Sequence, residues 1–208
     1  MGALPGYVLE TRSIPAAPHR VSDQASLRLE TFLGRFVEIG GGSATAGLTL
    51  CARLICEAQR DGGMAAWVGG TCSSFFPPDL AAAGVDLAAL AVVRVEDSGQ
   101  QWRACDILLR SGGFVLVVAD MAGGIGLPLS AQSRLAGLAQ HHHAALIALT
   151  REIRREVSRG SLVSLRAETT KRRAGHDCFV CEARVVKDKR RAPGWAHEEL
   201  RRGTDGLC

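Results

Sequence analysis

Residues 35–63 read RFVEIGGGSATAGLTLCARLICEAQRDGG, and this stretch decides the fold. Phe36, Val37 and Ile39 form a short apolar run that ends at three glycines, which predicts a buried strand followed by a turn. After the turn, apolar residues recur every three or four positions from Leu48 to Ala58, which predicts a helix with one buried stripe. The stretch is therefore expected to form a strand, a glycine-rich loop and a helix in that order.

A glycine loop at the start of a helix is a place where proteins bind phosphate groups. Loop N–H groups and the helix N-terminus together cradle the anion, as in a P-loop. The sequence therefore predicts an anion-binding loop. Its residues are Gly41, Gly42, Ser43, Ala44, Thr45, Ala46, Gly47, Leu48 and Thr49.

The rest of the chain alternates predicted strands and helices. The strands are expected at 64–68, 90–95, 114–119 and 144–149, and the helices at about 24–33, 99–110 and 129–142, with a short helix opened by the prolines at 77 and 78. The run FVLVVA at 114–119 is apolar at every position, which indicates a central strand covered on both faces. Segments 161–172 and 178–187 alternate apolar and polar residues around a turn at Gly175, which predicts an antiparallel hairpin. The expected fold is α/β, with a mainly parallel central sheet flanked by helices and an antiparallel C-terminal hairpin.

Composition suggests one domain with irregular ends. The chain is 47% hydrophobic and 22% charged, which is typical of a globular protein. We expect an N-terminal arm and helix at 1–34, a core at 35–192 and a flexible tail at 193–208.

No apolar run is long enough to cross a membrane, and the N-terminus lacks the basic and apolar segments of a signal peptide, so a cytoplasmic protein is expected. Seven cysteines, an odd number spread through apolar stretches, suit buried thiols in a reducing compartment.

Charge is distributed unevenly along the chain. Residues 151–208 carry 15 Lys and Arg against 9 Asp and Glu, whereas residues 1–150 carry 10 against 12. A basic C-terminal region can bind an anionic partner, such as nucleic acid or an acidic protein surface. It can equally be a solvated strand edge that is kept soluble by its charges.

Four segments resemble the RecA recombinase family. Residues 34–63 resemble the P-loop strand and helix of that family, and AAWVGGTCSSFFPPDLAAAGVDL at 65–87 resembles its next strand and helix. FVLVVADMAGG at 114–124 is similar to the Walker B strand, and ARVVKDKRRAP at 183–193 is similar to a basic strand end near the end of the family core. The order and spacing agree over roughly residues 30–192, which implies a RecA-like P-loop fold.

The P-loop departs from the family pattern at its charged position. In G-x-x-x-x-G-K-[ST], the lysine reaches the β- and γ-phosphates and the hydroxyl holds Mg²⁺. Aligned on its glycines, the chain has Leu48 in place of the lysine, and aligned on the helix end it has Gly47 there. Both registers remain open at this point, and both lack the lysine.

The other catalytic positions of the family are also changed. The general-base glutamate is replaced by the run Gly69–Cys72, which contains no carboxylate. The Walker B aspartate position falls on Ala119, with Asp120 one residue later, and a one-residue shift on a strand is expected to turn a side chain to the opposite face. We therefore expect no ATPase activity, no cofactor and no metal. The spacing of Cys178 and Cys181 does not alter this expectation, because residues i and i+3 of a strand point to opposite faces.

The resemblance also implies where partners bind. The two loops that line DNA in RecA-like proteins are short here, at 121–130 and 151–160, which argues against a nucleoprotein filament of the usual kind. Lys187 and Lys189 match two basic residues that reach a neighbouring subunit in the recombinase, which suggests that a docking face has survived. The predicted partner-binding residues are Arg184, Lys187, Lys189, Arg190 and Arg191.

A RecA-like core without a working ATPase resembles the ImuA family of translesion-synthesis accessory proteins. This resemblance implies a non-catalytic adaptor or regulator in the DNA-damage (SOS) response, which supports error-prone synthesis by binding RecA and an inactive polymerase-like subunit. Weak DNA binding through the basic C-terminal region and a homo-oligomer are both compatible with these features. Two alternatives remain at this point, a cell-division inhibitor of the SulA type and a slow atypical ATPase that uses Asp120 and the glycine loop.

Overall fold

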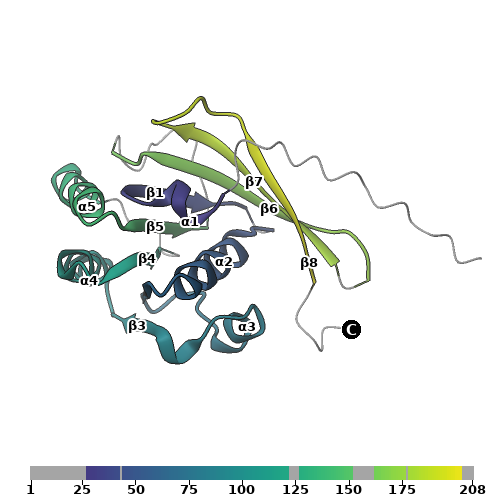
Figure 1. Cartoon of the computed structure of the whole chain (residues 1–208), viewed down its shortest axis with the longest axis horizontal. Helices are drawn as coiled ribbons and strands as arrows, with labels where there is room; N and C mark the ends of the chain where they lie inside the picture. Colours follow the sequence, from purple (N-terminus) through teal and green to yellow (C-terminus); the bar gives the residue numbers. More distant parts are fainter. Residues whose placement is uncertain (1–26, 43, 122–126, 152–161, 177, 203–208) are drawn as a thin grey trace, which may run out of the picture.

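The computed structural model describes residues 27–42, 44–121, 127–151, 162–176 and 178–202. These residues form an eight-stranded sheet in the order β3-β2-β4-β5-β1-β6-β7-β8, with helices packed on its faces (Figure 1). The pairings from β3 to β6 are parallel, and β7 and β8 are added antiparallel. The predicted α/β fold, with a mainly parallel sheet and an antiparallel C-terminal hairpin, is confirmed.

The helices and strands follow the predicted alternation closely. The strands are β1 (Arg35–Gly40), β2 (Met64–Gly69), β3 (Leu90–Arg94), β4 (Phe114–Asp120), β5 (Ala145–Thr150), β6 (Leu165–Arg173), β7 (Cys178–Asp188) and β8 (Ala196–Arg202). The α-helices are α1 (Leu29–Phe32), α2 (Gly47–Arg60), α3 (Pro77–Ala82), α4 (Ser98–Ser111) and α5 (Leu129–His141), and a 3₁₀ helix covers Leu87–Ala89. The helix expected at 24–33 is limited to the four residues of α1 among the described residues, and positions 24–26 lie outside them.

Two apolar layers cover the two faces of the sheet. On one face, Leu54 and Ile55 of α2 pack against alternate strand residues such as Val37 and Val118. On the other face, α4 and α5 cover the intervening residues of the same strands, among them Val117. Figure 1 shows α2 on one side of the parallel strands and α4 and α5 on the other. Strand β4 lies between β2 and β5, so the prediction of a central strand at 114–119 is confirmed.

Local signals explain where several helices begin and end. Pro77 opens α3, in keeping with the preference for proline in the first turn. Asp97 caps α4 by accepting a hydrogen bond from the Gln100 N–H at 2.8 Å. Gly112 ends α4 with φ +69°, a conformation that a residue with a Cβ adopts only with strain.

The predicted flexible tail is wrong for residues 196–202. These residues form β8, which pairs antiparallel with β7 from Cys178↔Arg202 to Arg184↔Ala196. The connection from β7 is itself fixed, because the Val185 N–H donates to the Trp195 carbonyl at 2.9 Å. The charged sequence of this segment does not predict a strand. The strand forms because its main chain pairs with the edge of β7. Residues 203–208 of the predicted tail lie outside the described residues.

Of the helices in the described ranges, none is both long enough and apolar enough to cross a membrane.

Candidate functional site

The glycine loop lies between the carboxyl end of β1 and the first turn of α2, as the sequence predicts. It packs against β6, the neighbour of β1 in the sheet. A Cβ atom at Gly41 would lie 2.1 Å from the carbonyl oxygen of Thr169, so only glycine fits there. The Lys171 N–H donates to the Ala44 carbonyl oxygen at 2.6 Å. The main chain of β6 therefore fixes the loop in place, with Ser43 outside the described residues.

A chain of hydrogen bonds through two threonines links the loop to the start of α2. The Gly47 N–H donates to Thr45 Oγ1 at 3.0 Å, and Thr45 Oγ1 lies 2.7 Å from Thr169 Oγ1. Because Thr169 Oγ1 donates to the Gly40 carbonyl at 3.1 Å, its own proton is used, and Thr45 must be the donor to Thr169. The Gly47 N–H, which an anion at this helix N-terminus would use, is therefore already bonded to a side chain of the loop.

The position expected to carry a phosphate-binding lysine is occupied by an aliphatic side chain. Leu48 is partly buried and packs against the apolar layer under α2. A side chain at position 47 would approach Leu149 Cδ1 to 2.7 Å, which favours the register in which Leu48 stands in the lysine position. No residue of the sequence 41–49 carries an amine or guanidinium group. The loop can offer main-chain donors to an anion, but no side chain that balances its charge.

Asp120 lies on the face of the sheet that α2 covers, whereas Ala119, at the expected Walker B position, packs on the opposite face under α4 and α5. Along β4, Leu116 and Val118 belong to the layer under α2, and the alternation of the strand places Asp120 with them. Burial, and to a lesser extent the charge of Asp120, raises the pKa of the Cys51 thiol in α2. The side chain of Asp120 is only 3% exposed. One buried carboxylate is therefore present on the same side as the glycine loop.

Hydrogen-bond donors from the segment after β2 already surround this carboxylate. Asp120 Oδ2 accepts from Ser73 Oγ at 2.7 Å, from the Ser74 N–H at 2.6 Å and from Ser74 Oγ at 2.9 Å. The indole N–H of Trp67 donates to Ser73 Oγ at 3.4 Å. Sequence analysis missed both serines, because their link to Asp120 exists only when the ends of β2 and β4 lie side by side. Asp120 therefore acts here as an acceptor that orders this connection.

Gln101 is a second polar residue that sequence analysis missed. It is buried, and its side-chain amide donates to the carbonyl oxygens of Val68 at 3.0 Å and Asp120 at 2.6 Å. One amide thus joins the carboxyl ends of β2 and β4, at the sheet edge where α/β proteins commonly bind ligands. The spacing of residues along α4 gives no sign of this role.

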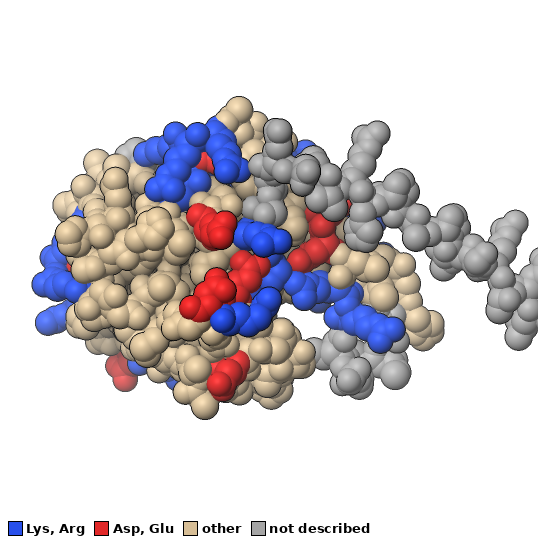
Figure 2. All heavy atoms as spheres, in the orientation of Figure 1, with Lys and Arg blue, Asp and Glu red and all other residues tan. Residues whose placement is uncertain are grey.

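The predicted basic residues lie at the far end of β7, where one of them borders a buried ion pair. Lys187 pairs with Arg166 in the register of β6 and β7, and Arg166 Nη2 lies 2.7 Å from Glu38 Oε2 of β1. Burial and the positive charges of Lys189 and Arg166 lower the pKa of Lys187, and Glu38 partly offsets them. Figure 2 shows Lys and Arg side chains gathered over the end of β7 and the connection to β8. Arg184, also predicted, lies 3.3 Å from Glu182 and is exposed.

Arg190 has a structural role within the chain. Its guanidinium donates to the carbonyl oxygens of Leu33 and Gly34, both at 3.2 Å, and its N–H donates to Asp188 Oδ1 at 2.9 Å. Asp188 also pairs with the buried Arg35. This network attaches the end of β7 to the turn between α1 and β1. Arg184, Lys189, Arg190 and Arg191 are all exposed at the surface, and Arg190 in addition bonds to the main chain before β1.

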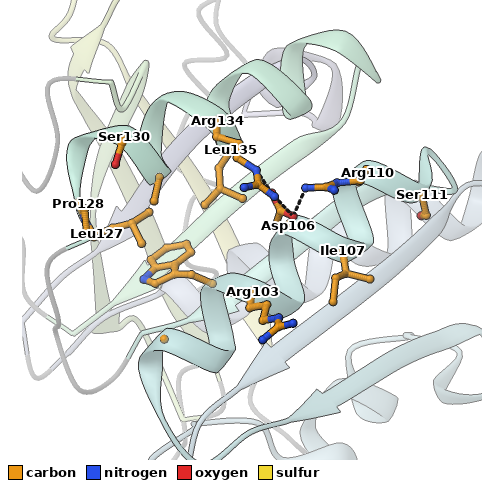
Figure 3. A pocket seen from close by; sticks show the side chains of 13 residues that line it. Arg103, Asp106, Ile107, Arg110, Ser111, Leu127, Pro128, Ser130, Arg134 and Leu135 are labelled. Carbon is orange, nitrogen blue, oxygen red and sulfur yellow. Dashed lines mark hydrogen bonds and ion pairs between the residues drawn. The ribbon is translucent and has the colours of Figure 1, made fainter.

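A groove of about 1060 Å³ lies between α4 and α5 (Figure 3). Arg110 of α4 and Arg134 of α5 converge on Asp106, each with an N···O distance of 2.6 Å. The floor is apolar, and the indole N–H of Trp102 is buried there with no partner among the described residues. Sequence analysis did not predict this groove, because it depends on how far apart α4 and α5 lie, and no sequence motif indicates that distance.

No cluster of potential metal ligands is found within the part of the chain that the structure describes. Cys178 and Cys181 lie in β7, where Cys181 is buried and Cys178 is partly exposed. Cys51, Cys56 and Cys105 are buried thiols, and burial raises the pKa of Cys105 to about 12.

Comparison with known proteins gives one consistent result. The family model for the RecA N-terminal domain matches residues 27–172. The RecA protein of Leifsonia xyli subsp. xyli is 34% identical over 128 residues, which are 58% of this chain and 35% of that protein. The RecA protein of Clavibacter michiganensis subsp. michiganensis is 33% identical over 127 residues, with the same two shares, and that of Corynebacterium jeikeium is 36% identical over 92 residues, 44% of this chain and 24% of that protein. The matched regions thus cover about a third or less of these relatives.

Proposed function

Since this chain belongs to the RecA N-terminal domain family, we propose that it is a non-catalytic adaptor or regulator in the DNA-damage (SOS) response. In this proposal it supports error-prone translesion synthesis by binding RecA and an inactive polymerase-like subunit, as its likeness to ImuA-type accessory proteins suggests. The observation that carries the proposal is the glycine loop, which keeps its place between β1 and α2 but has Leu48 where a phosphate-binding lysine is expected.

The geometry of the loop supports a role without ATP turnover. A hydrogen bond to a charged group contributes about 1.5–3 kcal/mol, and a lysine also balances charge in the transition state. Leu48 supplies neither effect. The Gly47 N–H is bonded to Thr45, so an entering phosphate would first have to displace that hydroxyl. Both features weaken nucleotide binding and leave the fold intact.

The exposed basic residues at the end of β7 support a protein-binding role. Arg184, Lys189 and Arg191 lie on the surface, and Arg190, which is also exposed, bonds to the main chain before β1. A group of exposed cations speeds association with an acidic protein surface and makes it sensitive to salt. We propose that these three residues, with Lys187 beside them, form the surface that contacts RecA or the polymerase-like subunit.

The test is a binding measurement between the full chain and purified RecA, with and without single-stranded DNA, and with the polymerase-like subunit. We expect binding that is lost when Arg184, Lys189 and Arg191 are changed together to Glu. Removing the whole C-terminal third would be a poor test, because β6 pairs with β1 and contributes to the core.

The matched control changes three exposed arginines elsewhere, Arg60, Arg94 and Arg103, to Glu. Both triple variants alter the net charge equally, so loss of binding in both would indicate a nonspecific charge effect. The adaptor proposal fails if the unaltered chain binds neither RecA nor the polymerase-like subunit.

One observation favours a second candidate, a slow atypical ATPase. Asp120 is a buried carboxylate on the same side of the sheet as the glycine loop, where a Mg²⁺ ligand would be useful. Titration of the chain with ATP and Mg²⁺ decides between the two. Sub-millimolar binding, with turnover that Asp120→Asn abolishes, would establish the enzyme, and the adaptor proposal predicts neither.

A further inference from the structure

Strand β8 forms the end of the sheet and has an ordered sequence of charges. Residues 196–202 read AHEELRR, with two acids before Leu200 and two bases after it. One edge of β8 pairs with β7, and no other strand of the described residues pairs with its second edge. Such an edge presents main-chain N–H and C=O groups to which another strand can bond.

The two faces of β8 differ in burial. His197, Glu199 and Arg201 are partly buried toward α2, where Glu199 lies 3.4 Å from Arg53. Glu198, Leu200 and Arg202 are exposed on the other face, and the side chain of Leu200 is one of the most exposed apolar groups, at 60%. Leu200 lies opposite Val180 of β7, so an apolar row reaches the sheet edge and ends there.

The charge order of β8 is complementary to itself when the strand is reversed. When two identical strands pair antiparallel about a two-fold axis, the residue at the axis lies opposite the same residue of the second copy. Each residue before the axis then lies opposite the residue that is equally far after it in the other copy. With Leu200 at the centre, Glu199 faces Arg201 of the second copy and Glu198 faces Arg202. Each of these contacts occurs twice, so four pairs of opposite charge form. We propose that β8 pairs in this way with β8 of a second copy of this chain and joins two sheets into one.

Neighbouring registers are disfavoured by the same charges. A centre at residue 199 places two glutamates directly opposite each other, and a centre at residue 201 does the same with two arginines. Like charges opposite each other destabilise a strand pair. With the centre at Leu200, the two leucines meet and extend the row from Val180 across the interface. The charge pattern of β8 therefore specifies one partner, one orientation and one register. The proposed dimer is separate from the adaptor function proposed above.

Sedimentation of the full chain over a range of concentrations tests the dimer. We expect an equilibrium between monomer and dimer that shifts toward monomer at high salt, because salt screens the charge pairs. A chain that stays monomeric at high micromolar concentration, or that assembles beyond two copies, would overturn the proposal.

Charge exchange tests the pairing itself. Glu198→Arg or Arg202→Glu alone places like charges opposite each other twice per dimer, and we expect the dissociation constant to rise about 10- to 100-fold. Both positions are exposed, so folding should be preserved. A mixture of the two single variants should restore dimers, because every cross-strand pair then has opposite charges. The doubly substituted chain should dimerise like the unaltered chain, and failure of either rescue contradicts the register.

A cysteine at the centre of the pair gives an independent test. In a background with Cys72, Cys178 and Cys208 changed to Ser, Leu200→Cys should form a crosslinked dimer under mild oxidation, because directly opposite residues have Cβ atoms within disulfide range. Glu198→Cys is the control and should not crosslink with itself, since position 198 faces position 202. Equal crosslinking of both variants would exclude the proposed register.

Discussion

At the scale of single residues, the glycine loop depends on how closely two segments of main chain approach each other. Gly41 lies against the carbonyl of Thr169, and the threonine hydroxyls beside it complete the contact between loop and β6. A position of this kind is required by packing, whether or not the loop binds a ligand. This explains why the loop requires its glycine although Leu48 stands where the family pattern would have a lysine.

Gly41→Ala should destabilise the protein. The added methyl group would meet the Thr169 carbonyl at 2.1 Å, and main chain can move aside only at a cost of about 1–3 kcal/mol. Urea denaturation monitored by circular dichroism measures the loss. Gly42→Ala is the control, because a Cβ added there would have no other atom within 4 Å, and it should change stability little. Equal effects at both positions would contradict this account.

At the scale of secondary-structure elements, the contact between α4 and α5 is partly electrostatic. Asp106 is largely buried under Arg110 and Arg134, whose side chains are each 58% exposed. Ion pairs with exposed arginines are weak, so the apolar floor of the groove carries most of the contact.

Asp106→Asn should therefore cost only about 0.5–1.5 kcal/mol, since two partly exposed ion pairs are lost. The difference should shrink at about 1 M salt, where the Debye length falls to about 3 Å. Thermal unfolding at low and high salt measures both effects, with the exposed Glu96→Gln as the control for loss of one negative charge. A loss that does not depend on salt would show that packing, and not charge, links Asp106 to the two arginines.

The attachment of β8 should depend on pH through Glu199. Burial alone would raise its pKa, but the nearby His197, with Nε2 3.7 Å from the carboxylate, a hydrogen bond from Arg201 and the charge of Arg53 lower it to about 2. The folded-state pKa lies below the usual value, so this stabilisation is complete above about pH 4.5 and is lost as the pH falls toward 2.

Urea denaturation at several pH values should show Glu199→Gln to be less stable than the unaltered chain at neutral pH, with the difference vanishing near pH 2. Glu198→Gln on the exposed face is the control and should show a much smaller pH-dependent difference. A constant difference for Glu199→Gln across this range would mean that its carboxylate charge is not what stabilises β8.

At the scale of the whole molecule, one apolar layer spans both parts of the sheet. Val185 of the antiparallel β7 and Leu165 of β6 belong to the same buried cluster as Trp67 and Ile147 of the parallel strands. We therefore expect a single cooperative unfolding transition. In a variant with Trp67→Phe and Trp102→Phe, the fluorescence of Trp195 should change at the same urea concentration as circular dichroism. An earlier fluorescence change would show that β6 to β8 unfold separately.

Much of this architecture could be predicted from sequence, because the parallel strands are apolar runs and the helices carry regular apolar stripes. FVLVVA at 114–119 indicated a central strand, and β4 is central. The segment AHEELRR gave no such signal, since its strand form depends on pairing with β7. The two serine donors of Asp120 and the role of Arg190 depend on contacts between distant segments, and a sequence pattern does not contain those distances.

The place of β1 in the sheet affects the order in which the chain can fold during synthesis. Both of its neighbours, β5 and β6, come later in the sequence, and the first paired residue on β5 is Ala145, opposite Arg35. At a translation rate of about 5–20 residues per second, roughly 5 to 20 s pass before that partner is made. During this interval β1 and its glycine loop have no sheet to join, whereas β2, β3 and β4 can already pair with one another. The segment by which the fold is recognised is therefore among the last to be locked into place on the ribosome.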